Sequence, residues 1–274
     1  MESVQMKIYE NIDKNKFIVI ADDFTGSNDC GVQFKNKGLS TITILNKDDL
    51  ELYKSYDVVV IDTETRNMNE NDAYITIEDI GKYLKFYFND YNIFKKIDST
   101  LRGNIESEIR ALDKALEPDL IAFIPAYPKN NRTMYKGIQY INEVPIDKTD
   151  MVNDPKHPVI TSNIIELLNC KSNMGFTHVS LEVIRNEDIL EAIKTSKSNK
   201  FSFDAVVDND IDIIIRTLSR LNKKVLWVGS AGLSNSLVNN IGVTTNTNNS
   251  IIVSIVGSIN SVSALQAKRA LKDR

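Results

Sequence analysis

The stretch IFKKIDSTLRGNIESEIRALDKAL, Ile93–Leu116, contains one complete unit of the fold. Ile93–Asp98 is an apolar run of strand length, and Ile105–Leu116 has the apolar spacing of an amphipathic helix. Between them lies a polar turn in which Gly103 permits close approach of other groups to the backbone. The stretch is therefore predicted to form a strand, a turn and a helix.

The same alternation extends outward along the chain. Buried strands are predicted at Phe17–Ala21, Ser40–Leu45, Asp57–Asp62, Ile93–Asp98, Leu120–Pro125 and Lys224–Gly229. Helix-like segments are predicted at Asp72–Asn89, Ile105–Leu116, Glu187–Lys194 and Ile211–Leu221. Nearly continuous apolar strands alternating with helices favour an α/β fold, a mostly parallel sheet with helices on both faces in three layers. Such sheets bind ligands at the carboxyl ends of their strands.

Three segments depart from this alternation. Residues 126–168 hold four of the six prolines, and we expect a β-rich excursion around residues 126–160, with a strand or hairpin at Gly137–Pro145. Residues 239–250 are polar apart from two apolar residues and carry no charge, which is typical of a linker. Residues 251–274 then contain one strand, a turn and one helix. The predicted domains are an N-terminal α/β domain at 1–238, the linker at 239–250, and the first βα unit of an incomplete second α/β domain at 251–274.

Composition narrows the class of protein. The chain has 274 residues, 42% of them hydrophobic and 26% charged, as in soluble globular proteins. Its net charge of −4 gives no electrostatic footprint for nucleic acid. Cys30 and Cys170 follow no ligand spacing and indicate reduced thiols in a cytoplasm. No targeting segment or membrane-length apolar run is visible, so we expect a cytoplasmic protein without a membrane partner. The sequence leaves a homo-oligomer open.

Two carboxylates follow the first predicted strand directly. Asp22 and Asp23 stand between that strand and a helix opening at Thr25–Ser27. One interpretation is simple capping of the helix. The functional interpretation is a carboxylate that accepts a hydroxyl proton or binds a polyol. Because successive residues of extended backbone point apart, we expect only one of the two to face a given ligand.

Cations and hydroxyls follow two further strands. Arg66 lies in a loop after Asp57–Asp62, where its guanidinium is a candidate clamp for a carboxylate or else an ordinary surface arginine. Lys96 and Asp98 are predicted to share one strand face. The turn beyond them adds Ser99, Thr100 and Arg102. This mixture is either a solvated loop or, as we favour, a site for a small, anionic, hydroxyl-rich ligand, because a charged pair at a buried strand end is costly without partners.

Two other stretches admit a functional and a structural interpretation. Arg132 lies in a proline-flanked loop that is either part of the site or a rigid excursion. The small-residue turn Val228–Leu233 could bind an anion on backbone N–H groups, but we favour a tight packing turn. No Walker A motif, spaced GxGxxG or plausible metal cluster is present, so no metal site is predicted.

Several of these motifs, in this order, resemble the four-carbon acid sugar kinase family. The matching stretches are ADDFTGSNDCGVQF (21–34), KKIDSTLRGN (95–104), PAYPKNNRTMYKGIQYINEVP (125–145) with NDPKHPV (153–159), LWVGSAGL (226–233) and IVSIVGSINSVSALQ (252–266). The chain departs from the family at Asn131 and Glu143, where glycine is common. Asparagine tolerates left-handed backbone, so the turn at Asn131 is expected to survive.

The resemblance implies an ATP-dependent kinase that acts on a sugar acid such as threonate, erythronate or 3-oxo-tetronate. It implies that the N-terminal domain binds the acid and a C-terminal domain binds ATP with Mg²⁺. The implied catalytic residues are Asp22 and Asp23, one of which orients or deprotonates the reacting hydroxyl. The implied substrate-binding residues are Arg66, Lys96, Asp98, Ser99, Thr100, Arg102 and Arg132. Gly257 and Ser258 fall on the nucleotide side.

The resemblance also sets an expectation about completeness. Family members continue well past residue 274, so we expect a truncated chain, in which the nucleotide partner domain is missing and which does not transfer phosphate alone. Two alternatives stay open. One is a sugar-acid-binding or regulatory module without catalysis. The other, less favoured, is a phosphosugar hydrolase with an aspartate nucleophile at Asp22 or Asp23.

Overall fold

A computed structural model describes residues 16–240 of the chain. The strands are β1 Phe17–Ala21, β2 Thr41–Ile44, β3 Val58–Asp62, β4 Asn92–Lys96, β5 Leu120–Ile124, β6 Arg132–Tyr135, β7 Ile138–Ile141, β8 Val144–Pro145, β9 Thr177–Val179, β10 Lys200–Phe203 and β11 Val225–Gly229. The α-helices are α1 Phe24–Asn36, α2 Glu70–Tyr87, α3 Ile105–Leu116, α4 Ile164–Asn169, α5 Leu181–Arg185, α6 Ile189–Thr195, α7 Asp208–Leu218 and α8 Ala231–Asn240. Short 3-10 helices include η2 Thr65–Asn67 and η3 Pro128–Asn130.

Eight strands form one parallel sheet in the order β2-β3-β1-β4-β11-β5-β10-β9. The chain first builds to one side of β1, with β2 and β3, and then crosses to the other side with β4. This reversal makes the carboxyl ends of β1 and β4 a topological switch point, where open α/β sheets bind ligands.

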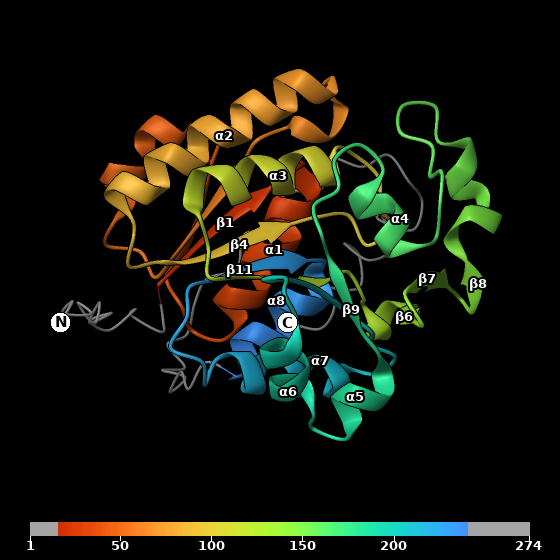
Figure 1. Ribbon diagram of the computed structural model, residues 1–274. Helices are drawn as coiled ribbons and strands as arrows, with labels where there is room; N and C mark the ends of the chain where they lie inside the picture. The colour runs from red at the N-terminus through yellow and green to blue at the C-terminus, as the bar shows by residue number, and fades with distance from the viewer. Residues whose placement is uncertain (1–15, 241–274) are drawn as a thin grey trace, which may run out of the picture.

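Helices cover both faces of the sheet. In Figure 1, α2 and α3 lie together on one face, while α1, α7 and α8 lie on the other. The predicted three-layer α/β fold is confirmed. Within it, β1 and β3 are buried along their whole length, as expected for strands covered on both sides. Helix α3 buries Ile105, Ile109 and Leu112 at helical spacing, which fixes its face toward the sheet.

The predicted β-rich excursion is a small antiparallel sheet of β6, β7 and β8. It is tied to the main fold where Met134 and Ala205 exchange backbone hydrogen bonds. The sequence analysis missed β9 and β10, which are only three and four residues long. Helix α8 extends to Asn240, so the first two residues of the predicted linker are helical. The remaining linker and the predicted second domain lie outside the described residues.

Within residues 16–240, no helix combines the length and the apolar character that crossing a membrane requires.

Candidate functional site

The three predicted clusters of polar residues meet at one edge of the sheet. Asp22 and Asp23 follow β1, Arg66 lies in η2 just after β3, and the turn from Asp98 follows β4. Because β1 pairs in parallel with both β3 and β4, the carboxyl ends of these strands are adjacent. The candidate site therefore lies at the switch point of the sheet.

Arg66 binds both aspartates. Its Nε and Nη2 atoms donate to the two oxygens of Asp22 at 2.7 and 2.8 Å. Its Nη1 and Nη2 atoms donate to the two oxygens of Asp23 at 2.7 and 2.8 Å. Both aspartates reach Arg66 because the backbone turns at Asp23, which caps α1 by accepting from the Gly26 N–H. Which of the two faces a ligand stays a prediction. Four of the five N–H donors of the Arg66 guanidinium, the group expected to clamp a ligand, thus bind the protein's own carboxylates.

The environment of Arg66 favours its charged form. Burial alone would lower the pKa of Arg66, but hydrogen bonds to Asp22 and the charges of Asp22, Asp98 and Asp23 outweigh it and raise that pKa. Removing one member of such a buried pair leaves an uncompensated charge, which is strongly destabilising. Arg66 therefore holds the two aspartates in place.

Gly103 makes room for this arrangement. Its φ of +97° lies in the region that favours glycine, and an added Cβ would lie 3.2 Å from Arg66 Cγ and 3.4 Å from Asp22 Oδ2. The next residue, Asn104, donates through its side-chain amide to the carbonyls of Thr65 and Met68 at 3.0 and 2.9 Å. The glycine expected to admit a ligand instead admits the Arg66 side chain.

The two lysines at the end of β4 point to opposite faces of the sheet. Lys95 turns to α3, where its Nζ atom lies 2.6 Å from Glu108 Oε2, and both side chains are almost completely buried. Lys96 turns to α1, where an added Cβ at Gly26 would lie 2.9 Å from its Nζ atom. The Lys96 ammonium donates to the carbonyl of Ile97 at 2.9 Å. Burial raises the pKa of Glu108, while the charge of Lys95 lowers it.

The turn after β4 forms its own hydrogen-bonded group. Asp98 accepts from the Thr100 hydroxyl at 2.5 Å and from Arg102 Nε at 2.6 Å. Arg102 also reaches Asp154 Oδ2 at 3.2 Å. The prediction that Lys96 and Asp98 share a strand face is wrong, because β4 ends at Lys96 and Asp98 belongs to the turn.

The charge state of Asp98 follows from these contacts. Burial alone would raise its pKa, but the hydrogen bond from Arg102, the charge of Arg66 and the hydrogen bond from Thr100 lower it. Asp98 is thus an ionised carboxylate beside two guanidinium groups. Together with the Arg66 cluster it provides hydrogen-bond acceptors for hydroxyl groups at the same edge.

A protein-family model, described as the sugar-binding N-terminal domain, matches residues 17–237. The chain belongs to this family. The matched range coincides with the described α/β domain and ends within α8. The family resemblance drawn from the sequence motifs is confirmed.

Several curated proteins that resemble this chain are named as kinases of sugar acids. The chain is 35% identical to the D-threonate kinase of Salmonella typhimurium, over 81% of this chain and 53% of that protein. It is 32% identical to the D-erythronate kinase of Heliobacterium modesticaldum, over 72% and 46%. It is 29% identical to the 3-oxo-tetronate kinase of Brucella melitensis, over 80% and 51%. The chain spans about half the length of the curated relatives it matches.

A solved structure from Bordetella bronchiseptica has the same fold, with a TM-score of 0.69 and 28% identity over 82% of this chain and 55% of that one. That protein is described as a domain of unknown function with bound citrate, forming a domain-swapped dimer. A protein from Haemophilus influenzae matches with a TM-score of 0.71 at 24% identity, over 84% and 57%, and supports the fold.

Not every predicted site residue joins the group at the end of β1 and β4. Arg132, on β6, donates to the Asn130 carbonyl, and within residues 16–240 no hydrogen bond or ion pair joins it to the aspartate–Arg66 cluster. Ser99 contributes its carbonyl, which accepts from the Gln139 side chain at 3.1 Å and so ties β7 to the turn. The small β6–β7–β8 sheet therefore supports the turn through Gln139, and a role for Arg132 in substrate binding stays a prediction.

The small-residue turn after β11 is a packing turn. The Ser230 hydroxyl donates to the Ala126 carbonyl at 2.9 Å and accepts from the Gly232 N–H at 3.1 Å. The Gly232 N–H is thus bonded within the turn, and a Cβ at Gly232 would lie 2.5 Å from the Ala126 carbonyl oxygen, as expected where two backbone segments pack closely. Gly257 and Ser258, predicted on the nucleotide side, lie outside the described residues.

Three carboxylates of the site escaped the sequence analysis. Glu108 lies on a polar-looking stretch of α3, and nothing in the helical pattern separates it from solvent-exposed glutamates. Asp62 ends β3 and is 4% exposed, and burial raises its pKa from 3.8 to about 6. Asp154 lies 52 residues from its partner Arg102. Of the three, only Asp62 could have been singled out from the sequence, because it lies at the carboxyl end of a buried strand, as Asp22 does.

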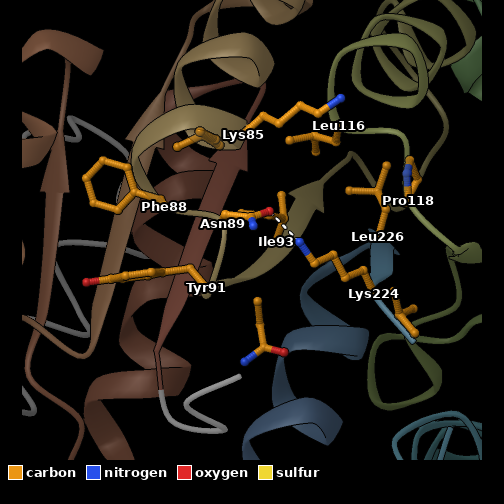
Figure 2. A pocket seen from close by; sticks show the side chains of 12 residues that line it. Lys85, Phe88, Asn89, Tyr91, Ile93, Leu116, Pro118, Lys224 and Leu226 are labelled. Atoms are coloured by element: carbon orange, nitrogen blue, oxygen red, sulfur yellow. Dashed lines mark hydrogen bonds between the residues drawn. The ribbon is translucent and has the colours of Figure 1, made fainter. Parts of the chain in front are cut away.

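Cavities lie at both ends of the sheet. One of about 180 Å³ adjoins the site and is lined by Gly103, Asn104 and His157 among others. A smaller one, of about 50 Å³, lies at the amino ends of β4 and β11 (Figure 2), where Leu84, Phe88 and Leu226 line it and Lys224 donates a hydrogen bond to Asn89. Its position at the opposite edge separates it from the charged cluster.

Proposed function

We propose that this chain binds a four-carbon sugar acid at the carboxyl ends of β1 and β4, as the acid-binding part of an ATP-dependent kinase that phosphorylates a hydroxyl of that acid. The observation that carries the proposal is the convergence at this edge of the carboxylates of Asp22, Asp23 and Asp98 with the Thr100 hydroxyl and the buried Lys96 ammonium. The names of the curated relatives support the substrate class.

The residues at the edge divide into acceptors and donors. The carboxylates of Asp22, Asp23 and Asp98 can accept hydrogen bonds from sugar hydroxyls. We propose that Asp22 or Asp23 receives the reacting hydroxyl, which it orients for attack on the phosphoryl donor. Arg66 holds this carboxylate in place through its hydrogen bonds. Its part in the reaction is then positioning, in place of the direct grip on the substrate carboxylate expected from the sequence.

The described residues fit the acceptor side of the reaction and do not fit the nucleotide side. Among residues 16–240, no group of three or more His, Cys, Asp or Glu side chains could hold a metal ion. The turn at Ser230 is closed by Ala126. Binding of ATP and Mg²⁺ is therefore proposed for the longer protein by family resemblance, and no reaction step is assigned to them in this domain.

Isothermal titration calorimetry tests the proposal. The chain is titrated with D-threonate and D-erythronate, each with and without MgATP, and ADP release is followed in parallel. Saturable binding of at least one acid supports the acid site. No binding of either acid at millimolar concentration contradicts it. Binding of an acid with neither ATP binding nor ADP release favours the alternative function, a sugar-acid-binding module, for the chain alone.

A further inference from the structure

Strand β2, Thr41–Ile44, lies at one edge of the main sheet. Among the described strands it pairs with β3 alone, because it is the first strand in the order of the sheet. An edge strand leaves backbone N–H and C=O groups without a strand partner, and proteins commonly protect such an edge with a charged side chain, a proline or a bulge. The four residues of β2 are Thr-Ile-Thr-Ile, all β-branched and without a charge or a proline. The outer edge of β2 is therefore chemically suited to pair with another strand.

Two exposed leucines accompany this edge. Leu45 follows β2 directly and is 73% exposed. Leu52 is 74% exposed and belongs to the 3-10 helix η1, Lys47–Tyr53, which packs against both β2 and β3. Exposed apolar side chains grouped beside an unpaired strand edge are typical of an interaction surface.

The two ends of β2 carry opposite charges. Lys35 and Lys37 precede the strand at the end of α1, and Asp49 and Glu51 follow it in η1. Within residues 16–240, neither of these lysines forms an ion pair, and neither does Asp49. When two identical strands pair antiparallel about a two-fold axis, the start of each lies beside the end of the other. The lysines of one copy then lie beside the acidic residues of the second copy, so the edge is complementary to itself.

We propose that β2 pairs antiparallel with β2 of a second copy of this chain, which joins two eight-stranded sheets into one. A second copy is favoured over an unrelated strand because the edge carries both halves of the charge pattern. Leu45 and Leu52 supply apolar contacts beside the paired strands, while the charges at the strand ends fix the antiparallel direction. This interface is separate from the acid site at β1 and β4 and does not rest on the proposed function.

Sedimentation velocity of the full chain over a range of concentrations tests the interface. The wild type is expected to sediment as a dimer at micromolar concentrations. Leu45→Lys places a charge in the interface and is expected to raise the dimer dissociation constant by about tenfold or more. Ile160→Lys is the matched control, because Ile160 is also 73% exposed but lies in the loop before α4, and this variant should sediment like the wild type.

An exchange of charges provides a second readout that does not depend on Leu45. Lys37→Glu should weaken the dimer about 3- to 10-fold, because it brings like charges together, and adding Asp49→Lys should restore most of the affinity. Circular dichroism checks that each variant is folded. A wild type that stays monomeric, a dimer that Leu45→Lys leaves intact, or a second substitution that fails to restore the affinity overturns the proposal.

Discussion

The two lysines at the end of β4, Lys95 and Lys96, lie on opposite faces of the sheet and differ in their contacts. On the α3 side, Lys95 meets Glu108 at 2.6 Å, and the pair is sealed from solvent. On the α1 side, Lys96 is also buried, but within the described chain it faces no carboxylate at ion-pair distance. Two lysines adjacent in sequence therefore have different tasks.

The difference follows from the alternation of side chains along a strand. Successive residues point to opposite faces, so Lys95 and Lys96 are assigned to different layers. On the α3 side, the charge of Lys95 is balanced by that of Glu108, and the pair belongs to the folded core. The α1 side holds Lys96 and Asp62, neither of which forms an ion pair with another described residue.

Lys95→Met should produce the largest loss of stability. It leaves Glu108 buried without its partner, which costs about 3–5 kcal/mol of unfolding free energy. Urea unfolding measures this. The double variant Lys95→Met with Glu108→Leu should recover most of the loss, because an apolar pair replaces the ionic one. Equal stability of the single and double variants would contradict the pairing.

Gly103→Ala should cost about 1–3 kcal/mol, because alanine must adopt a left-handed φ and its Cβ approaches Arg66. Urea unfolding again provides the measurement. Gly175→Ala is the control, since this glycine has a similarly positive φ of +72° but nothing within 4 Å of an added Cβ. A larger loss for Gly103 than for Gly175 isolates the contribution of the Arg66 contact. Equal losses would mean that the contact is unimportant.

Asp62→Asn tests the environment of Asp62, on the α1 side of the sheet, through the pH dependence of the unfolding free energy. The pKa of Asp62 is raised from 3.8 to about 6, so the folded protein binds a proton more tightly than the unfolded chain. Its contribution to stability is therefore present below about pH 4 and is lost as the pH rises through about 6. The asparagine variant should be more stable than the wild type by about 1–2 kcal/mol at neutral pH. The gain should vanish at about pH 4, and a gain that does not depend on pH would refute the titration.

Gly26→Ala should have the smallest effect on stability and a local effect on binding. Its Cβ would displace the ends of Asp23 and Lys96, and we expect D-threonate to bind about tenfold more weakly. Gly31→Ala, in the same helix, meets only ordinary contacts at 3.5 Å or more and should bind like the wild type. Indistinguishable calorimetric titrations of the two variants would place the ligand elsewhere.

The sequence predicted the positions of the strands well, but it predicted poorly which side chains bind one another. All six predicted strands occur within two residues of their expected bounds. The reason is that strands of a parallel sheet are covered on both faces, so their sequences are nearly continuous apolar runs. Arg66 was singled out, but its four hydrogen bonds to Asp22 and Asp23 depend on strand order, which no local pattern encodes. The different environments of Lys95 and Lys96 likewise emerge only when α1 and α3 are placed.

A crystal structure of the chain with bound D-threonate tests the central claim most directly. The account predicts that the ligand lies at the carboxyl ends of β1 and β4, with a hydroxyl within hydrogen-bond distance of Asp22 or Asp23, while Arg66 keeps its bonds to both aspartates. A carboxylate seated on Arg66 in place of the aspartates, or a ligand bound away from the carboxyl ends of β1 and β4, would contradict it.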